Sequence, residues 1–254
     1  CGIAFSGGRD SSAVLAIAVD VARRDGLPEP IPITRVFENA PRAEELKWQE
    51  MVIRHLGISD WERLSFTDEL DVVGPIAAQV LYRHGVVWTP LVHAYMPLFD
   101  RLRGGSLLDG EGGDEVLGVR YHRIEPVARL RRGPREVSRT TVKAMVRACA
   151  PAWLRRRAAH QKATRAPHGW LTPVGQVAWA DAIVEFEVRA PFSHTASVRR
   201  AAALRSATLL QHNRSVLAID RDVRAASPFL RPEVVDALAR QAGWLGKGSR
   251  TDVL

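Results

Sequence analysis

The sequence is poor in the residues that build disulfide-rich or zinc-bound proteins, because only two of its 254 residues are cysteines, Cys1 and Cys149. Two thiols cannot form a disulfide framework or a four-thiolate zinc site. Long apolar runs are also missing: the longest, residues 13–19, is far shorter than the roughly 20 residues that span a bilayer. No secretory signal is recognisable, so we expect a cytoplasmic protein without a membrane partner.

Acidic residues are scarce in one part of the chain. Residues 119–165 hold fourteen of the 36 Lys and Arg residues but only two acids, Glu125 and Glu136, so the net charge of this segment is +12. The remainder carries −4, which makes the overall +8 a local property. Such an excess favours an anionic substrate or partner and says nothing about the fold. The change of charge and pattern predicts two regions, residues 1–118 and 119–254.

Short apolar runs alternate with helical patterns before residue 119. Strands are predicted for residues 1–5, 31–37, 63–66 and 106–108, and helices for residues 11–24, 41–56, 69–84 and 90–102. This alternation predicts an α/β fold in which helices cover both faces of a parallel sheet. Beyond residue 119 we expect a mostly helical part, interrupted by prolines, with no strand.

The most informative segment is Ser6-Gly7-Gly8-Arg9-Asp10-Ser11-Ser12, between the first predicted strand and the first predicted helix. Open parallel sheets bind ligands at the carboxyl ends of their strands. The two glycines let backbone N–H groups point at an anion, and the helix N-terminus adds its dipole. The serines supply hydroxyl donors, and Asp10 can hold a magnesium ion on the phosphates. A plain turn capped by Asp10 or Ser11 is the alternative, but the combination favours a phosphate site.

A second segment, residues 107–118, follows the fourth predicted strand and reads LLDGEGGDEVLG. Glu111, Asp114 and Glu115 place three carboxylates close together, which is costly unless a cation or a proton offsets their repulsion. A metal-bound nucleotide would do so, whereas the alternative is a solvated acidic turn. No lysine follows the glycines of the first segment, so the chain has no Walker A loop.

The first segment resembles the SGGxDS loop of the N-type ATP pyrophosphatases, and the second resembles the SGEGADE loop in the synthetase domain of the asparagine synthetases. Weaker similarity in residues 44–57 and 223–230 extends the resemblance over nearly the whole chain. It implies a fold like that of the adenine nucleotide alpha hydrolases. It also implies an ATP-dependent ligase that forms an amide through an acyl-adenylate and releases pyrophosphate.

The resemblance further implies which residues carry the reaction. Those that would bind ATP are Ser6, Gly7, Gly8, Asp10, Ser11, Ser12, Val36 and Gly110. Asp10 and Asp114 would hold Mg²⁺, and Glu111 would transfer a proton when the amine attacks. The partners would be a small-molecule or peptide carboxylate and an amine, or ammonia that a separate glutaminase can supply.

Three departures from the family pattern bear on activity. Asp109 replaces a small serine and adds a charge beside the nucleotide position, and Arg231 replaces the aspartate that commonly follows PFL. The sequence also stops at Leu254, before the basic stretch in which the family has a catalytic lysine, and Lys247 is no clear substitute for that lysine.

Three alternatives to a general amide ligase stay open. Within the same class, the basic helical part suits a larger, acidic substrate, as in the lasso-peptide cyclases. An RNA-modifying enzyme with a pyrophosphate loop would use the basic segment on phosphates, but nucleic acid is not expected, because the CxxC motif of thiolating members is absent. The third is a nucleotide-binding protein without catalysis.

Overall fold

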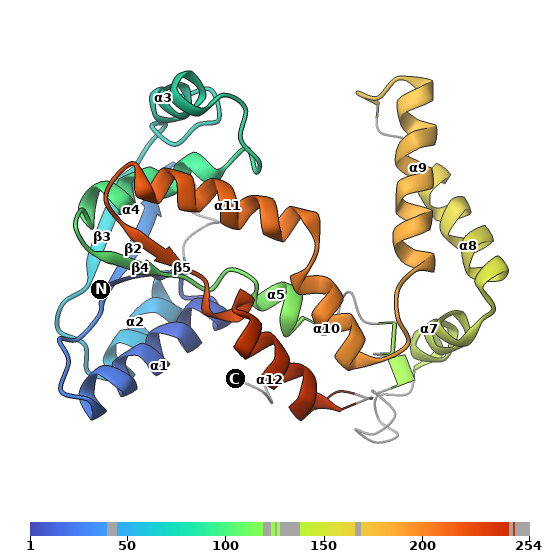
Figure 1. The fold of residues 1–254 in the computed structure, drawn as a ribbon, viewed down its shortest axis with the longest axis horizontal. Helices are drawn as coiled ribbons and strands as arrows, with labels where there is room; N and C mark the ends of the chain where they lie inside the picture. The colour runs from blue at the N-terminus through green and yellow to red at the C-terminus, as the bar shows by residue number, and fades with distance from the viewer. Residues whose placement is uncertain are drawn as a thin grey trace. The chain divides into compact units, whose positions relative to one another are not determined.

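The structure is a computed structural model that describes residues 1–39, 45–118, 123–124, 126–127, 138–165, 169–243 and 246. Within this part of the chain, five strands form one all-parallel sheet in the order β3-β2-β1-β4-β5 (Figure 1). The strands are β1 (Gly2–Ala4), β2 (Ile31–Phe37), β3 (Glu62–Phe66), β4 (Ser106–Leu108) and β5 (Arg224–Ala226). The parallel sheet predicted from the alternating pattern is confirmed, and β1 lies at its centre.

Helices cover the two faces of this sheet. Figure 1 shows α1 and α2 below it and α4 and α11 above it. The helices that accompany the sheet are α1 (Arg9–Arg24), α2 (Leu46–Leu56), α3 (Pro75–His84), η2 (Val92–Tyr95), α4 (Met96–Arg101), α5 (Gly113–Val116), α11 (Arg205–Ile219) and η6 (Pro228–Leu230). No helix of the described residues is long and apolar enough to cross a membrane.

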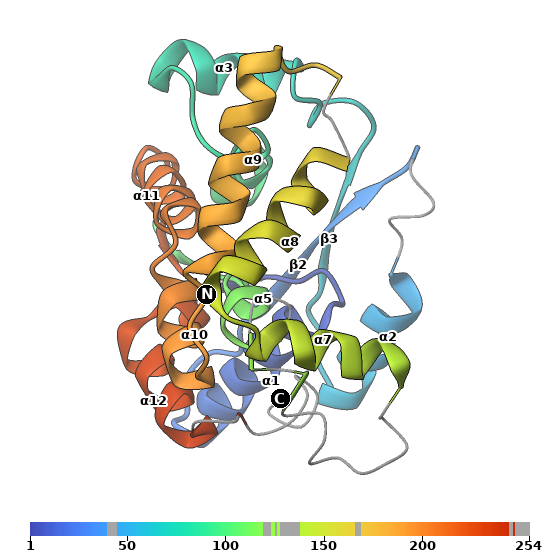
Figure 2. The ribbon, with the colours of Figure 1, turned by 90° about the vertical axis from the view of Figure 1, so that its right-hand side faces the viewer.

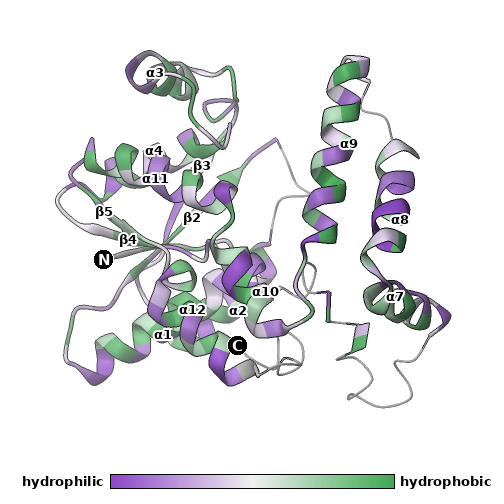
Figure 3. Cartoon of the chain, turned by 45° about the vertical axis from the view of Figure 1, so that its right-hand side comes forward, coloured by the Kyte–Doolittle hydropathy of each residue, from purple (hydrophilic) through white to green (hydrophobic). Residues whose placement is uncertain are grey.

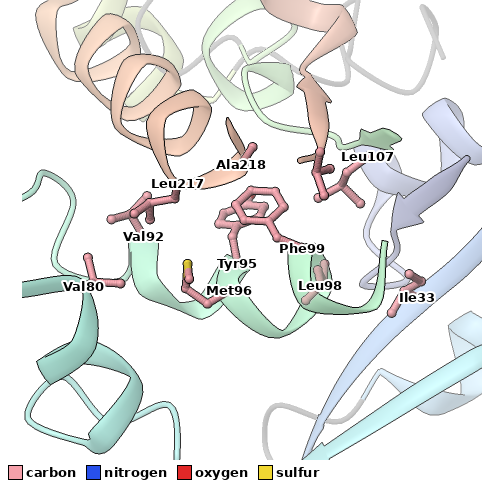
Figure 4. Packing of buried hydrophobic residues seen from close by; sticks show 11 residues of the cluster. Ile33, Val80, Val92, Tyr95, Met96, Leu98, Phe99, Leu107, Leu217 and Ala218 are labelled. Atoms are coloured by element: carbon pink, nitrogen blue, oxygen red, sulfur yellow. The ribbon is translucent and has the colours of Figure 1, made fainter. Parts of the chain in front are cut away.

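One hydrophobic cluster ties the upper face of the sheet to its helices (Figure 4). Ile33 of β2 and Leu107 of β4 pack with the apolar side chains of η2 and α4, and α11 adds Leu217. Phe99 is fully buried, and its ring stacks on that of Tyr95 with centroids 5.9 Å apart. Burial of each such side chain contributes about 1.5–3 kcal/mol, so this cluster holds η2 firmly on the sheet.

The described residues form two compact units. Unit 1 comprises residues 1–116 and 202–235 and contains the whole sheet, whereas unit 2 comprises residues 117–201 and 236–253. Unit 2 includes α7 (Arg139–Cys149), α8 (Ala152–Arg165), α9 (Pro173–Val188) and α10 (His194–Ala202), and α12 (Pro232–Ala242) begins in unit 1 and ends in unit 2. Helices α8 and α9 lie side by side (Figure 2). The domain division predicted at residues 118 and 119 stays a prediction.

Three expectations from the sequence need correction. The strand β5 lies beyond residue 119, where none was expected, because three residues are too few to show an alternating pattern. The helix predicted from residue 69 begins only at Pro75, after two turns closed by Asp68 and Asp71. The helix predicted over residues 90–102 is a 3₁₀ turn, η2, followed by the short helix α4. The first part of the helix predicted over residues 41–56 lies outside the described residues.

Candidate active site

The two informative segments follow neighbouring strands. The loop of Ser6–Ser12 leaves the carboxyl end of β1, and the loop beginning at Asp109 leaves the carboxyl end of β4, with Ile3 paired to Leu108 between them. The order of the strands along the chain reverses at β1, because β2 lies on one side of it and β4 on the other. A reversal of this kind opens a crevice where α/β sheets bind their ligands. The candidate site is therefore at the expected edge of the sheet.

Hydrogen bonds within the first loop fix its shape. The Ser11 hydroxyl donates to the Gly8 carbonyl oxygen at 3.1 Å and accepts the Ser6 backbone N–H at 3.2 Å. The Ser6 hydroxyl lies 3.1 Å from the Ser11 hydroxyl and accepts the Gly8 N–H at 3.2 Å. Two of the three serine hydroxyls are thus engaged in holding the loop.

The third serine of the loop is different. The Ser12 hydroxyl oxygen is buried and makes no hydrogen bond with any described residue. A buried polar group without a partner costs free energy, which a bound ligand can recover. Gly8 precedes α1 and has no side chain to occupy the N-terminus of that helix. Both features suit an anion at the start of α1.

Helix α2 holds the first loop from outside. Gln49 is 6% exposed, and its side-chain amide donates to the Ser6 carbonyl oxygen at 2.8 Å. Gly7 has φ +88°, and a Cβ there would come within 2.7 Å of the Gln49 side chain. Gly7 is therefore required both by its backbone conformation and by the close approach of α2.

The two loops touch each other through glycines of the second. A Cβ at Gly110 would come within 2.7 Å of the Ser11 backbone nitrogen, and a Cβ at Gly113 would overlap the carboxylate of Asp10. Asp114 follows Gly113 directly in the first turn of α5. The predicted metal ligand Asp10 thus lies against the segment that carries the other, Asp114. Within the described chain, no three or more His, Cys, Asp or Glu side chains gather as a metal site of their own.

Glu111 is held by a tyrosine. The Tyr95 hydroxyl donates to Glu111 Oε1 at 2.8 Å. Burial, followed by the negative charges of Asp109 and Glu111, raises the pKa of the Tyr95 hydroxyl well above its ordinary value. Tyr95 therefore stays protonated at neutral pH and acts as a donor. Burial also raises the pKa of the nearby Glu115, more than the charges of its acidic neighbours do.

Asp109 does not expose its charge, contrary to the expectation of an added charge beside the nucleotide. It is 2% exposed and forms an ion pair with Arg214 of α11, which is equally buried. The Ser227 hydroxyl donates to Asp109 Oδ1 at 2.6 Å. The extra carboxylate is therefore neutralised inside the fold.

Comparison with known families decides the relationship of the chain. The asparagine synthase family matches residues 1–241. The chain belongs to the asparagine synthase family. No curated protein matches it.

Family membership makes the chain a relative of ATP-dependent ligases, and the roles assigned to single residues stay predictions. Val36 is half-buried near the end of β2, beside the central strand. Arg231, the second departure from the asparagine synthase pattern, follows η6 and lies 3.7 Å from the exposed Glu233. Lys247 lies outside the described residues.

Four residues near the asparagine synthase motifs were not singled out from the sequence: Gln49, Tyr95, Arg214 and Ser227. Tyr95 lies in a buried 3₁₀ turn, Gln49 and Arg214 lie on partly exposed helices, and Ser227 directly follows a strand. Arg214 gives the clearest signal, because an arginine is rarely buried unless it is paired. The partner of each lies far away in the sequence, which is why the pattern alone does not reveal these contacts.

Proposed function

We propose that the chain is an ATP-dependent carbon–nitrogen ligase. It activates a carboxylate as an acyl-adenylate, releases pyrophosphate and transfers the acyl group to an amine. The observation that carries this proposal is the meeting of the two loops, in which Asp10 of the first lies against Gly113 of the second. Membership of the asparagine synthase family supports the same class of reaction.

The first loop is proposed to bind the phosphates of ATP. Its backbone N–H groups and the N-terminus of α1 suit a pyrophosphate, and the unpartnered Ser12 hydroxyl can donate to it. The hydroxyls of Ser6 and Ser11 contribute by holding the loop. Val36 and Gly110 are proposed to lie against the adenosine.

Asp10 and Asp114 are the proposed magnesium ligands. Mg²⁺ is usually bound by one or two carboxylates together with substrate phosphates, so two carboxylates beside a phosphate loop fit its requirements. When bound, Mg²⁺ neutralises charge on the departing pyrophosphate. Gly113 contributes by leaving room for the Asp10 carboxylate beside the acidic loop.

Glu111 is the proposed base. An amine that attacks the acyl-adenylate must lose a proton, and a positioned base contributes about 10²- to 10⁴-fold to such a step. The Tyr95 hydroxyl orients the carboxylate through Oε1, and Oε2 is the proposed proton acceptor. In this proposal Glu111 acts only after adenylation, so the two half-reactions depend on different residues.

Pyrophosphate release tests the proposal. The full chain is incubated with ATP, Mg²⁺ and a panel of carboxylic acids and acidic peptides, with ammonia or primary amines as acceptors. We expect pyrophosphate to appear only with a suitable carboxylate, and the amide to be detected by mass spectrometry. Release that depends on RNA and on no carboxylate would contradict the ligase proposal and favour the RNA-modifying alternative. Nucleotide binding without any turnover would favour a non-catalytic protein.

The variant Glu111→Gln tests the separation of the two half-reactions. We expect carboxylate-dependent exchange of pyrophosphate into ATP to persist, while amide formation falls by about 10²- to 10⁴-fold. The exposed Glu50→Gln on α2 is the control and should change neither reaction. An equal loss of ATP binding in the Glu111 variant would show that this residue acts on the nucleotide instead.

A lasso-peptide type of cyclisation is the second candidate within the same class. The basic residues of α8, which has no acidic residue, favour an acidic peptide over a small acid. Figure 3 shows hydrophilic stretches along this helix. The peptides in the panel above distinguish the two. A cyclase joins the amine and the carboxylate of one peptide, so its product is lighter than the linear peptide by the mass of one water and contains no added ammonia.

A further inference from the structure

A closed triangle of hydrogen bonds surrounds the buried Asp109. Asp109 Oδ2 accepts from Arg214 Nη1, and Asp109 Oδ1 accepts from the Ser227 hydroxyl at 2.6 Å. Arg214 Nη2 donates to the same hydroxyl oxygen at 2.7 Å. The Ser227 hydroxyl therefore donates its one hydrogen to Asp109, and its oxygen accepts the hydrogen bond from Arg214. The triangle joins the end of β4, the end of β5 and helix α11.

The triangle reaches Glu111 by two separate routes. Asp109 Oδ1 accepts the backbone N–H of Glu111 at 3.0 Å, which fixes the backbone at that residue. The Arg214 guanidinium lies 5.5 Å from the centre of the Tyr95 ring, and the Tyr95 hydroxyl holds the Glu111 carboxylate at 2.8 Å. Backbone and side chain of Glu111 are thus anchored to the same buried ion pair.

Stability alone does not explain this ion pair. Well-packed neutral residues often replace a buried ion pair without loss of stability, whereas removing one partner leaves a buried charge uncompensated. In this chain a carboxylate and a guanidinium have been placed within contact of the residues that hold Glu111. Their opposite charges cancel beside Glu111, so the loss of either charge changes the field at that carboxylate.

We propose that Asp109, Arg214 and Ser227 are positioning residues that fix both the orientation and the electrostatic environment of Glu111. The proposal rests on the proposed function and adds to it the three residues that prepare the base. Among the described residues, the charged or titratable side chains near Glu111, its neighbouring glycines or the Tyr95 ring are Asp10, Arg35, Tyr95, Asp109, Asp114, Glu115 and Arg214. Asp109 and Arg214 form a buried ion pair with each other.

Three variants test the proposal by the direction of a pH shift: Arg214→Met, Asp109→Asn and the double variant. In Arg214→Met the uncompensated Asp109 favours the protonated form of Glu111, so the acidic limb of the pH–rate profile for amide formation moves to higher pH by about one unit. In Asp109→Asn the uncompensated Arg214 favours the ionised form of Glu111, and the acidic limb moves to lower pH. In the double variant the two shifts cancel. Amide formation at the optimum falls by about 10²-fold in the single variants, while pyrophosphate exchange changes much less.

A matched pair on the protein surface is the control. Arg83 and Asp220 form an ion pair in the same unit, and their neutral variants Arg83→Met and Asp220→Asn should leave the pH profile unchanged. A merely structural triangle would lower both half-reactions together without opposite pH shifts, and that outcome overturns the proposal. If Arg214→Met does not fold, Arg214→Lys keeps the charge but loses the contact with Ser227, and it should lower amide formation without moving the limb.

A measurement without substrates separates this proposal from the proposed function. In protein labelled with ¹³C at the glutamate side-chain carboxyls, the resonance missing from Glu111→Gln reports the titration of Glu111. Its midpoint should move up in Arg214→Met and down in Asp109→Asn whether or not the chain is active. Unmoved midpoints overturn the triangle's role even in an active ligase. Failure of wild-type turnover with shifted midpoints overturns only the proposed function.

Discussion

The two compact units differ in their ion pairs: among the described residues, unit 1 has a fully buried pair beside several exposed ones, whereas the pairs between α8 and α9 in unit 2 are exposed. In unit 1 the ion pair of Asp109 with Arg214 is 2% exposed on each side and lies beside the candidate base. In unit 2, Arg156 pairs with Glu185 and Lys162 with Glu187, and every one of these side chains is more than a third exposed. Exposed pairs contribute about 0–1 kcal/mol, whereas breaking a buried pair costs about 3–5 kcal/mol.

This difference separates charge that prepares chemistry from charge that presents a surface. Part of the basic excess of residues 119–165 lies on α8, and two cations of this helix are matched by glutamates of the adjacent α9. Unit 1 has the smaller charge imbalance, yet its few buried charges contact the candidate site. Net charge therefore indicates partners, while burial indicates which charges can influence a reaction. The predictions that follow test this division.

The largest effect on pyrophosphate exchange is expected from Asp10→Asn in unit 1. The variant removes one proposed magnesium ligand and should lower pyrophosphate exchange at least about 10²-fold, because metal-ion stabilisation of charge is worth several kcal/mol. The exposed Asp20→Asn on the same helix is the control. Unchanged pyrophosphate exchange in the Asp10 variant would contradict the proposal that Asp10 binds Mg²⁺. It would also weaken the distinction between reactive charge in unit 1 and surface charge in unit 2.

The next effect is expected from Gly113→Ala. Its Cβ would overlap the Asp10 carboxylate, so the two loops must separate or the carboxylate must move. We expect pyrophosphate exchange to fall by about 10- to 10²-fold, since misplacing a catalytic group by about 1 Å has effects of that size. Gly169→Ala in unit 2 is the matched control, because a Cβ there meets nothing within 4 Å. Equal behaviour of the two variants would show that the loops do not act together.

The sequence predicts the sheet and both loops because their signals are local. The Ser6–Ser12 segment combines glycine, serine and a following apolar helix within a few residues, and the structure places it at the central strand as expected. The contacts of Tyr95, Arg214 and Ser227 cannot be read in this way. Each of these residues meets a partner from another element, over 16, 105 and 118 positions, and only the fold brings them together.

Asp109 also shows that a local sequence pattern does not reveal contacts between distant residues. Alone in the sequence it is a charge added to a nucleotide site, but with Arg214 it is half of a buried neutral pair. The two interpretations of Asp109 differ because its partner, Arg214, lies on a helix 105 positions away in the sequence. The short strand β5, which Ser227 directly follows, was missed for a related reason, because its three residues show no pattern.

A moderate effect on stability is expected from Asp220→Asn, at the end of α11 in unit 1. Partial desolvation opposes ionisation of Asp220, but the hydrogen bonds and charges of Arg83 and His84 outweigh it and lower the pKa of this carboxyl. The stabilisation is therefore present above the unfolded pKa of about 3.9 and is lost as the pH falls through the lower folded value. Urea unfolding should show a loss of about 1 kcal/mol at pH 7 that shrinks as the pH falls below the unfolded pKa and through the lower folded value. A constant difference over that range would contradict the assignment.

The smallest effect is expected from the double variant Arg156→Gln, Lys162→Gln on α8. Both cations make exposed pairs with glutamates of α9, so their loss should lower the free energy of unfolding by less than about 1 kcal/mol, and less again at high salt. Pyrophosphate exchange with a small carboxylate should stay within about twofold of wild type, since these exposed side chains pair with glutamates of α9 and are not among the proposed ATP or magnesium ligands. A selective rise of KM for acidic peptides would assign the basic surface to substrate capture. A loss of exchange with every carboxylate would instead break the division between surface charge and reactive charge, because exposed cations of unit 2 would then support the chemistry of unit 1.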